Sequence, residues 1–398
     1  MTVLSICIPT RNRQTFAMDA VRHMLRSTRQ DFEVLVADNS DNPEPLRLFA
    51  ADVADSRLRV LPPEPQPLSM RANWDRLIPQ TRGEWLIIIG DDDYADPEIC
   101  EVIRVATAAV RLVDAIAWGR SYFSWPDARA AREVTVIPTG SHLVNVEKKD
   151  MMRKMFFWEE AKDRPGCPFG IYHGAVRREL MERIRSAFSN TYFEHGNVDY
   201  DNICKTVMMA DAFVFWERPM SVFGACRASN SMGLRDQEIG RQRNATFFAE
   251  NPDKFEADNF PFPIALGVTA SIGHTIESFK QRYGIELKGW EENFISACAK
   301  DCETCVDRAQ FETRKAGYAK AIKAWRGAAA LSRFKPEFKW RPGVPKFLGT
   351  AENLLFFDMA MGDARSAAEF YDVLDAMLFP VHLLETRLTQ PLRTAEAA

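Results

Sequence analysis

Three acidic residues follow an apolar run early in the chain, and no other feature constrains the fold as strongly. Residues 87–90 read Ile-Ile-Ile-Gly, and Asp91, Asp92 and Asp93 come directly after them. A short apolar run that ends at a turn is typical of a buried strand. Three neighbouring carboxylates repel one another in a medium of low dielectric unless a divalent cation neutralises them. The pattern indicates a Mg²⁺ or Mn²⁺ site at a strand end. A solvated acidic turn that caps the next helix is the alternative.

The first hundred residues alternate between strand and helix patterns. Apolar, β-branched runs predict strands, and apolar residues spaced three and four apart predict helices. The alternation predicts an α/β fold, with an open, mostly parallel sheet and helices on both faces. The expected strands are Val3–Ile8, Phe32–Ala37, Leu58–Leu61 and Trp85–Ile89, and the expected helices are Gln14–Ser27, Arg71–Ile78 and Glu98–Val113.

Beyond about residue 240 the alternation gives way to long helix-like segments. These segments are Pro263–Tyr283, Glu291–Ala330 and Ala364–Leu378. Prolines punctuate the chain just before them, which predicts a boundary between an α/β domain over residues 1–240 and a mainly helical domain over residues 241–398. The large apolar residues within Phe347–Met361 and Phe370–Leu384 suit a core best. A dimer surface or a resting place on a membrane stays open for them.

Composition excludes two broad classes of protein. The 398 residues include 27 Phe and 9 Trp, which is too much apolar surface for a disordered chain. The chain has 51 Lys+Arg against 55 Asp+Glu and a formal net charge of −4, which argues against a nucleic-acid partner. The length fits two or three domains.

The N-terminal residues and the cysteines indicate in which cellular compartment we expect the protein. Met1–Pro9 has neither a basic leader nor a small-residue cleavage site, and no apolar stretch approaches the roughly 18 residues of a membrane helix. We therefore expect a cytoplasmic protein with reduced cysteines. Cys298, Cys302 and Cys305 have a spacing that some iron–sulfur enzymes use. Because they lie in Glu291–Gln310, a stretch with helical periodicity, buried packing on a helix is favoured.

Polar residues also follow the first and second expected strands. They are Pro9, Thr10, Arg11, Asn12 and Arg13 after the first strand, and Asp38, Asn39, Ser40 and Asp41 after the second. Because the carboxyl ends of parallel strands meet at one edge of a sheet, these groups converge with the acidic turn on one crevice. A bound nucleotide would explain the convergence, with Asp38 accepting hydrogen bonds from the base and Arg11 or Arg13 meeting phosphate. Taken singly, each is also a common turn or capping residue.

Three segments together resemble the family 2 glycosyltransferases. They are residues 5–13 (SICIPTRNR), 33–41 (EVLVADNSD) and 83–93 (GEWLIIIGDDD), in the order and at the separations usual in that family. The resemblance implies a GT-A fold, a Rossmann-like α/β domain that binds a nucleoside-diphosphate-sugar. It implies that Asp38 contacts the nucleotide base and that Asp91 and Asp93 bind the metal–diphosphate, with Mn²⁺ or Mg²⁺ as the metal. Asp92 would then lie near the sugar or ribose. The second segment departs from the family's usual Asp-Asp-Gly-Ser, which leaves the identity of the base open.

A later acidic segment, Asn197–Asp201, looks like the motif that supplies the general base in this family. Asp199 is the first choice for the carboxylate that deprotonates the acceptor hydroxyl, and Asp201 is the second. A helix-capping acid is the alternative for Asp199. His173 and His195 line the acceptor side or are hydrogen-bonded structural histidines. The residues assigned to the nucleotide-sugar are Pro9, Thr10, Arg11, Asn12, Arg13, Asp38, Asn73, Asp91, Asp92 and Arg227.

The expected activity is inverting, metal-dependent transfer of a sugar from a nucleoside-diphosphate-sugar to a hydroxyl of a glycan, lipid-linked or similar acceptor, as in polysaccharide synthesis. A nucleotidyltransferase acting on sugar phosphates is an alternative, although residues 9–13 lack the glycines of its phosphate loop. A non-catalytic domain that binds a nucleotide or a partner protein is another. No nucleic-acid partner is expected. Peripheral membrane contact or a homo-oligomer through the C-terminal helices stays open.

Overall fold

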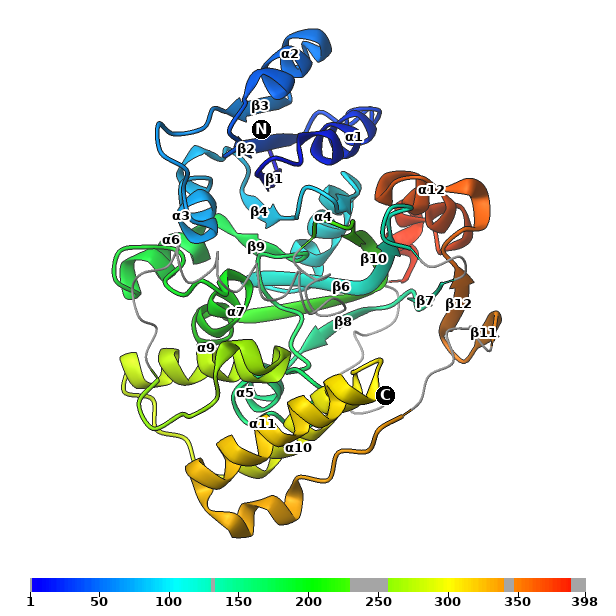
Figure 1. Ribbon diagram of the computed structural model, residues 1–398. Helices are drawn as coiled ribbons and strands as arrows, with labels where there is room; N and C mark the ends of the chain where they lie inside the picture. The colour runs from blue at the N-terminus through cyan, green and yellow to red at the C-terminus, as the bar shows by residue number, and fades with distance from the viewer. Residues whose placement is uncertain (1, 130–132, 230–256, 340–346, 388–398) are drawn as a thin grey trace.

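A computed structural model describes residues 2–129, 133–229, 257–339 and 347–387 of the chain (Figure 1). The strands are β1 (Leu4–Thr10), β2 (Phe32–Asp38), β3 (Leu58–Leu61), β4 (Trp85–Ile88), β5 (Tyr94–Ala95), β6 (Val113–Ser124), β7 (Val134–Pro138), β8 (Leu143–Val146), β9 (Ala175–Arg177), β10 (Ala212–Ala225), β11 (Gly349–Ala351) and β12 (Leu354–Asp358). The α-helices are α1 (Gln14–Met24), α2 (Glu44–Val53), α3 (Met70–Asp75), α4 (Ile99–Ala109), α5 (Lys148–Phe156), α6 (Arg178–Ala187), α7 (Val198–Met209), α9 (Val268–Arg282), α10 (Glu291–Glu303), α11 (Arg308–Arg326) and α12 (Ala367–Met377). Short 3₁₀ turns are η1 (Ile78–Gln80), η3 (Ile264–Leu266), η4 (Ala328–Arg333), η5 (Met361–Asp363) and η6 (Val381–Arg387).

One large mixed sheet organises the described residues. Its strand order is β3-β2-β1-β4-β9-β6-β10-β5, and β8 pairs with β10. The N-terminal strands β1 to β4 are parallel to one another, and β6 is parallel to β10. The short strand β9 joins these two parallel groups because it runs antiparallel to both β4 and β6. The expected α/β fold with a mostly parallel sheet is confirmed, and the antiparallel joining strand is a feature that periodicity did not predict.

The two faces of the sheet carry separate hydrophobic cores. Successive side chains of a strand point to opposite faces, so Ile6 and Ile8 lie in one core and Cys7 in the other. The core that contains Cys7 is covered by α3, α5, α6, α7 and α9 to α11, and the core that contains Ile6 by α1, α2, α4 and α12. Figure 1 shows α9 to α11 gathered on one side of the sheet, with α12 beside β10 on the other. The part of the chain beyond residue 257 therefore contributes to both cores.

Two expected helices end earlier than their periodicity suggested. The stretch Glu291–Gln310 is not one helix, because α10 ends at Glu303 and α11 begins at Arg308. Asp307 starts the second helix by accepting a hydrogen bond from the backbone N–H of Gln310 at 2.7 Å, and an acidic N-cap of this kind favours a new helix over continuation. Likewise α4 ends at Ala109, and Val113 already belongs to β6.

The expected packing of the late cysteines is confirmed. Cys298 and Cys302 lie on α10 and Cys305 just after it, and all three thiols are buried in the hydrophobic core. Burial raises the pKa of each thiol, so these groups stay protonated and behave as small apolar side chains.

The large apolar residues near the C-terminus are mostly core residues, as expected. Phe357, Phe370 and Leu374 are buried against the sheet, whereas Phe347 and Leu348 are exposed. Among the described helices, none combines the length and the apolar character needed to cross a membrane. The predicted boundary at residue 240 lies outside the described residues and stays a prediction.

Candidate active site

The ends of β1, β2 and β4 meet at one edge of the sheet, as the sequence predicted. Thr10 is the register partner of Asp38, and its Oγ1 donates a hydrogen bond to Asp91 Oδ2 at 2.7 Å. The loops after β1 and β2 are joined by Asn12, whose backbone N–H donates to Ser40 Oγ at 2.8 Å and whose side chain donates to Asp41 at 2.9 Å. Asn12 has φ of 57°, a left-handed conformation that asparagine tolerates better than most residues. The two loops thus form one polar rim beside the acidic turn.

Asp91 is held by the loop that follows β1. The Arg13 guanidinium lies 2.6 Å from Asp91 Oδ1, and its Nε donates to Asp91 Oδ2 at 3.1 Å. The Asp91 side chain has no exposed surface. Burial raises the pKa of Asp91 to about 7, although the charge of Arg13 opposes this, and the charge of Asp92 raises it further. Asp91 Oδ2 therefore has two hydrogen-bond donors, whereas Oδ1 is paired only with the charge of Arg13 and accepts no hydrogen bond from the described residues.

Asp93 is the most completely bonded of the three carboxylates. Its Oδ2 accepts hydrogen bonds from Gly90 N (2.6 Å), Tyr172 Oη (2.9 Å) and His173 Nε2 (2.8 Å), and its Oδ1 accepts one from Gly224 N (2.7 Å). Burial opposes ionisation, yet the contact with His173 and the backbone hydrogen bonds lower the pKa of Asp93 below its usual value. Through these hydrogen bonds, the Asp93 carboxylate links the acidic turn to the loop before β9 and to the end of β10.

Asp92 keeps one oxygen available. Its Oδ2 accepts a hydrogen bond from Cys226 N at 3.1 Å, and Arg13 Nη1 lies 3.7 Å away. Among the described residues no hydrogen bond reaches Asp92 Oδ1. Burial and the charge of Asp93 raise the pKa of Asp92, so a cation at this position would offset an existing electrostatic cost. The backbone packs tightly here, because a Cβ on Gly224 would lie 1.7 Å from the Asp92 carbonyl oxygen.

The end of β2 also has an acidic group with one engaged oxygen. Asp38 is buried, and its Oδ1 accepts a hydrogen bond from Ser40 N at 3.0 Å. Arg76 donates to the Asp38 carbonyl at 2.6 Å and to Asn73 Oδ1 at 2.8 Å. Asn73 in turn donates to the Ala37 carbonyl at 3.4 Å. Asn73 therefore supports the loop that carries Asp38, with its oxygen already engaged.

The later acidic segment lies at the N-terminal end of α7. Asp199 is half-buried, and its Oδ1 accepts a hydrogen bond from Tyr200 N at 2.9 Å. Burial raises the pKa of Asp199, while the charges of Arg120 and Arg164 oppose the shift. The charge of Asp199 raises the pKa of Tyr172, which bonds Asp93, so Asp199 lies within electrostatic range of the residues around the acidic turn.

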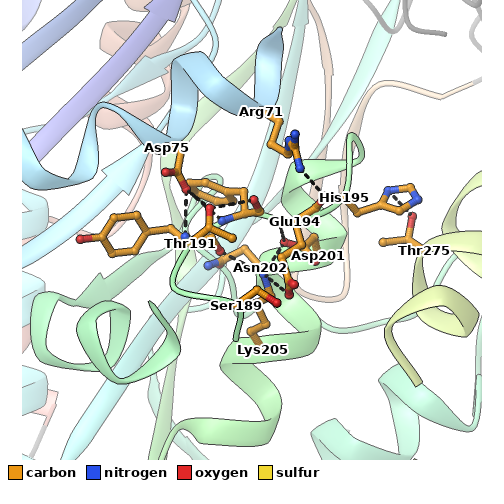
Figure 2. A network of polar contacts seen from close by, with 12 residues as sticks. Arg71, Asp75, Ser189, Thr191, Glu194, His195, Asp201, Asn202, Lys205 and Thr275 are labelled. Atoms are coloured by element: carbon orange, nitrogen blue, oxygen red, sulfur yellow. Dashed lines mark hydrogen bonds and ion pairs between the residues drawn. The ribbon is translucent and has the colours of Figure 1, made fainter. Parts of the chain in front are cut away.

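Asp201 belongs to a buried polar network instead (Figure 2). Its Oδ2 accepts hydrogen bonds from Lys205 Nζ and from Glu194 N, both at 2.8 Å. Lys205 is fully buried and lies 3.1 Å from Glu194 Oε2. Asp75 at the end of α3 accepts a hydrogen bond from Thr191 Oγ1 at 2.6 Å, so this network continues toward the donor side. Asp201 therefore holds the loop that precedes α7.

The remaining predicted residues lie at the rim or away from it. Pro9 is partly buried at the end of β1, and Arg11 is exposed beside it. Arg227 is also exposed, and its backbone N–H bonds Asp127 Oδ2 at 3.1 Å. His195 is buried against Thr275 of α9, where burial and the neighbouring His274 lower its pKa to about 3. The structure does not bring His195 to the acidic turn.

Sequence reasoning left two readings of His173, a residue on the acceptor side or a hydrogen-bonded structural histidine, and the structure bonds it directly to Asp93 and Ser221. It did not single out Tyr172 or the backbone N–H groups of Gly224 and Cys226, which bond Asp93 and Asp92. These contacts join residues 79 to 134 positions apart. No local pattern in the sequence encodes partners at that separation.

Among the carboxylates of the acidic turn, Asp92 is the one that could hold a divalent cation. The described residues contain no group of three His, Cys, Asp or Glu side chains arranged to hold a metal. Mg²⁺ and Mn²⁺ sites that act on phosphates commonly use one or two carboxylates together with the phosphate oxygens of the substrate. Asp92 Oδ1 meets that need, whereas Asp91 is already paired with the Arg13 guanidinium and both oxygens of Asp93 are hydrogen-bonded within the protein.

Part of the chain is similar in sequence to a known protein family. Residues 5–185 match the family model described as glycosyl transferase family 2. A search of curated proteins found no match. Among solved structures, S. aureus TarS 1-349 in complex with UDP-GlcNAc is 11% identical, covers 84% of this chain and 89% of that chain, and has a TM-score of 0.45. The mannosyltransferase PcManGT from Pyrobaculum calidifontis, in complex with GDP-Man and Mn²⁺, is 14% identical, covers 83% of this chain and 84% of that chain, and has a TM-score of 0.37.

Proposed function

Because residues 5–185 form a family 2 glycosyltransferase domain with the GT-A type of α/β fold, we propose that the protein transfers a sugar, with inversion, from a nucleoside-diphosphate-sugar to an acceptor hydroxyl. The acceptor is a glycan, a lipid-linked glycan or a similar alcohol, and the reaction belongs to polysaccharide or glycoconjugate synthesis in the cytoplasm. The observation that carries the proposal is a pair of acidic segments within electrostatic range of each other. One has a carboxylate oxygen at Asp92 that no described residue bonds, and the other has a carboxylate of raised pKa at Asp199.

The donor occupies the crevice at the carboxyl edge of β1, β2 and β4. Asp38 has an oxygen that no described residue bonds, which suits an N–H of the nucleotide base. Arg13 presents a half-buried guanidinium beside the acidic turn, which suits a diphosphate oxygen. Asn12 and Thr10 fix the two loops that carry these groups.

Mn²⁺ or Mg²⁺ would be held by Asp92 together with the diphosphate of the donor. The cation supplies charge neutralisation for the departing nucleoside diphosphate. Asp91 and Asp93 then act by orienting Asp92, because their oxygens are engaged with Thr10, Arg13 and His173.

Asp199 is the proposed general base. Inverting transfer needs one carboxylate on the acceptor side, placed to accept the hydroxyl proton as the new glycosidic bond forms. Burial raises the pKa of Asp199 toward the pH range in which a base is most effective. Asp201 is the weaker candidate, since Lys205 and Glu194 N already bond its Oδ2.

The experiment measures thermal stability and donor hydrolysis with nucleoside diphosphates and their sugars in the presence of Mn²⁺. A donor that binds the folded state raises the Tm by mass action, by an amount that grows with concentration. The proposal expects one nucleotide to raise the Tm and its sugar form to be hydrolysed slowly or transferred. A raised Tm without turnover on any sugar form would favour a non-catalytic binding domain. No shift with any nucleotide would contradict the donor site.

A nucleotidyltransferase remains the second candidate. It also binds a nucleotide and a metal through acidic residues at strand ends, and would turn over a nucleoside triphosphate with a sugar phosphate. The same assay separates the two functions by product, because only a nucleotidyltransferase releases pyrophosphate.

A further inference from the structure

His173 sits where the acidic turn, the loop before β9 and the end of β10 meet. Its side chain is buried, and its two ring nitrogens each have one partner. Nε2 lies 2.8 Å from Asp93 Oδ2, and Nδ1 lies 2.8 Å from Ser221 Oγ. The ring also stacks on Phe223 with the centroids 3.6 Å apart.

The partner of Nε2 determines which ring nitrogen carries the proton. An ionised carboxylate can only accept, so Nε2 carries the hydrogen and donates it to Asp93. In the neutral ring Nδ1 is then the acceptor, and the Ser221 hydroxyl donates to it. The Ser221 oxygen accepts in turn from Trp118 Nε1 at 2.8 Å. The chain Trp118–Ser221–His173–Asp93 thus has one consistent direction of donation.

The backbone around His173 is also specialised. His173 has φ of 55°, in the sparsely populated left-handed region, where histidine is found more often than most residues other than glycine. A backbone conformation of this kind persists where surrounding contacts hold a side chain in one place. The hydrogen bonds of both ring nitrogens and the stacking on Phe223 are contacts that do so.

We propose that His173 is a positioning residue of the donor site, which fixes the Asp93 carboxylate as the anchor of the acidic turn and thereby aims Asp92 at the metal–diphosphate. The inference rests on the proposed function. Asp93 Oδ1 bonds Gly224 N, and Asp92 bonds Cys226 N two residues further along. A rotation of Asp93 would therefore move both the turn and the end of β10 that contacts it. His173 itself touches neither donor nor acceptor in this account.

The test compares two replacements of His173, one that can still donate a hydrogen bond to Asp93 and one that cannot. His173→Gln places an amide N–H near the position of Nε2, whereas His173→Asn tolerates the left-handed backbone but cannot reach Asp93. His142→Asn is the matched control, because His142 also pairs with a carboxylate, Glu217, at 3.0 Å but lies outside the site. Isothermal titration calorimetry measures the affinity for Mn²⁺ with whichever of UDP, GDP, ADP and dTDP stabilises the wild type most.

We expect His173→Asn to weaken Mn²⁺-dependent nucleotide binding by about 10- to 100-fold, the range usual for loss of a partner that orients a metal ligand. His173→Gln should recover most of that loss, and His142→Asn should bind as the wild type does. A purely structural role would lower the Tm of both His173 variants without a rescue of affinity by glutamine. Unchanged affinity in folded His173→Asn would overturn the inference.

A second variant keeps the inference testable if His173→Asn does not fold. Ser221→Ala leaves the four donors of Asp93 in place but removes the hydroxyl that bonds His173 Nδ1 and holds the ring in its orientation. We expect nucleotide binding about 10-fold weaker, and wild-type affinity would overturn the inference. Failure of the wild type itself to bind any nucleotide with Mn²⁺ would instead contradict the proposed function on which the inference depends.

Discussion

The two acidic segments of this protein have the same internal arrangement. In each, one carboxylate is tied to the protein and a neighbour is left accessible to the site. Asp93 accepts four hydrogen bonds beside the less engaged Asp92, and Asp201 pairs with the buried Lys205 beside the less engaged Asp199. Burying a carboxylate without partners is costly, so a tied neighbour is a physical means of holding a functional acid rigidly in place.

The carboxylates of the two segments also differ in the direction of their pKa shifts. The contacts of Asp93 lower its pKa, whereas burial raises the pKa of Asp92 and of Asp199. A carboxylate with a lowered pKa stays ionised and anchored across a wide pH range. A carboxylate with a raised pKa is costly to keep ionised, so a nearby cation stabilises it most, or it accepts a proton readily. The difference assigns anchoring to Asp93 and chemistry to Asp92. Burial raises the pKa of Asp201 as well as that of Asp199, so in the second pair the ion pair with Lys205, and not the pKa, distinguishes the anchoring member.

The largest expected effect is on turnover in Asp199→Asn. An amide cannot accept the hydroxyl proton, so kcat should fall by about 10² to 10⁴-fold, the usual contribution of a general base. The affinity for nucleotide should stay as in the wild type, since the proposed function assigns Asp199 to the acceptor and not to the donor. Steady-state kinetics and calorimetry together check this prediction. A kcat within about threefold of the wild-type value would contradict the assignment of Asp199 as the general base.

Asp201→Asn should act on stability instead. The change leaves Lys205 buried with a weaker partner, and breaking a buried ion pair typically costs about 3–5 kcal/mol. Because Glu194 still lies 3.1 Å from Lys205, we expect the lower end, about 3 kcal/mol. Urea unfolding measures the loss. If Asp201→Asn is as stable as the wild type but inactive, the roles of Asp199 and Asp201 are exchanged.

The sequence predicted the convergence of the strand ends but not the division of roles within each acidic segment. Buried runs and turn residues are local, so β1, β2, β4 and the polar groups behind them followed from the pattern. The contacts that tie down Asp93 come from His173 and Gly224, which lie 80 and 131 residues away. The helix break before Asp307 was encoded locally as an N-cap, yet helical periodicity on both sides masked it.

A smaller effect is expected from pH, through the loop that precedes α7. Burial and the neighbouring His274 lower the pKa of His195 to about 3 from its ordinary 6.5, so the folded state holds this ring neutral. The unfolded chain takes up the proton below about pH 6.5, so this contribution to stability is present above that pH and is lost as the pH falls toward 3.

Replacing His195 with Asn should therefore flatten the dependence of stability on pH. Urea unfolding of both proteins between about pH 7 and pH 4 measures the two slopes. The wild type should lose more stability over this range than His195→Asn, with the other acidic groups contributing equally to both. Equal slopes would show that His195 is accessible to protons in the folded state.

The most direct test of the central claim is the free energy of unfolding of Asp93→Asn, measured beside that of Asp92→Asn. An anchoring Asp93 with four hydrogen bonds predicts a loss of about 3 kcal/mol for Asp93→Asn, because its buried donors would face an amide. Asp92→Asn should stay within about 1 kcal/mol of the wild type and lose Mn²⁺-dependent nucleotide binding. An Asp93→Asn variant as stable as the wild type, yet unable to bind the metal–nucleotide, would contradict the account and make Asp93 a metal ligand.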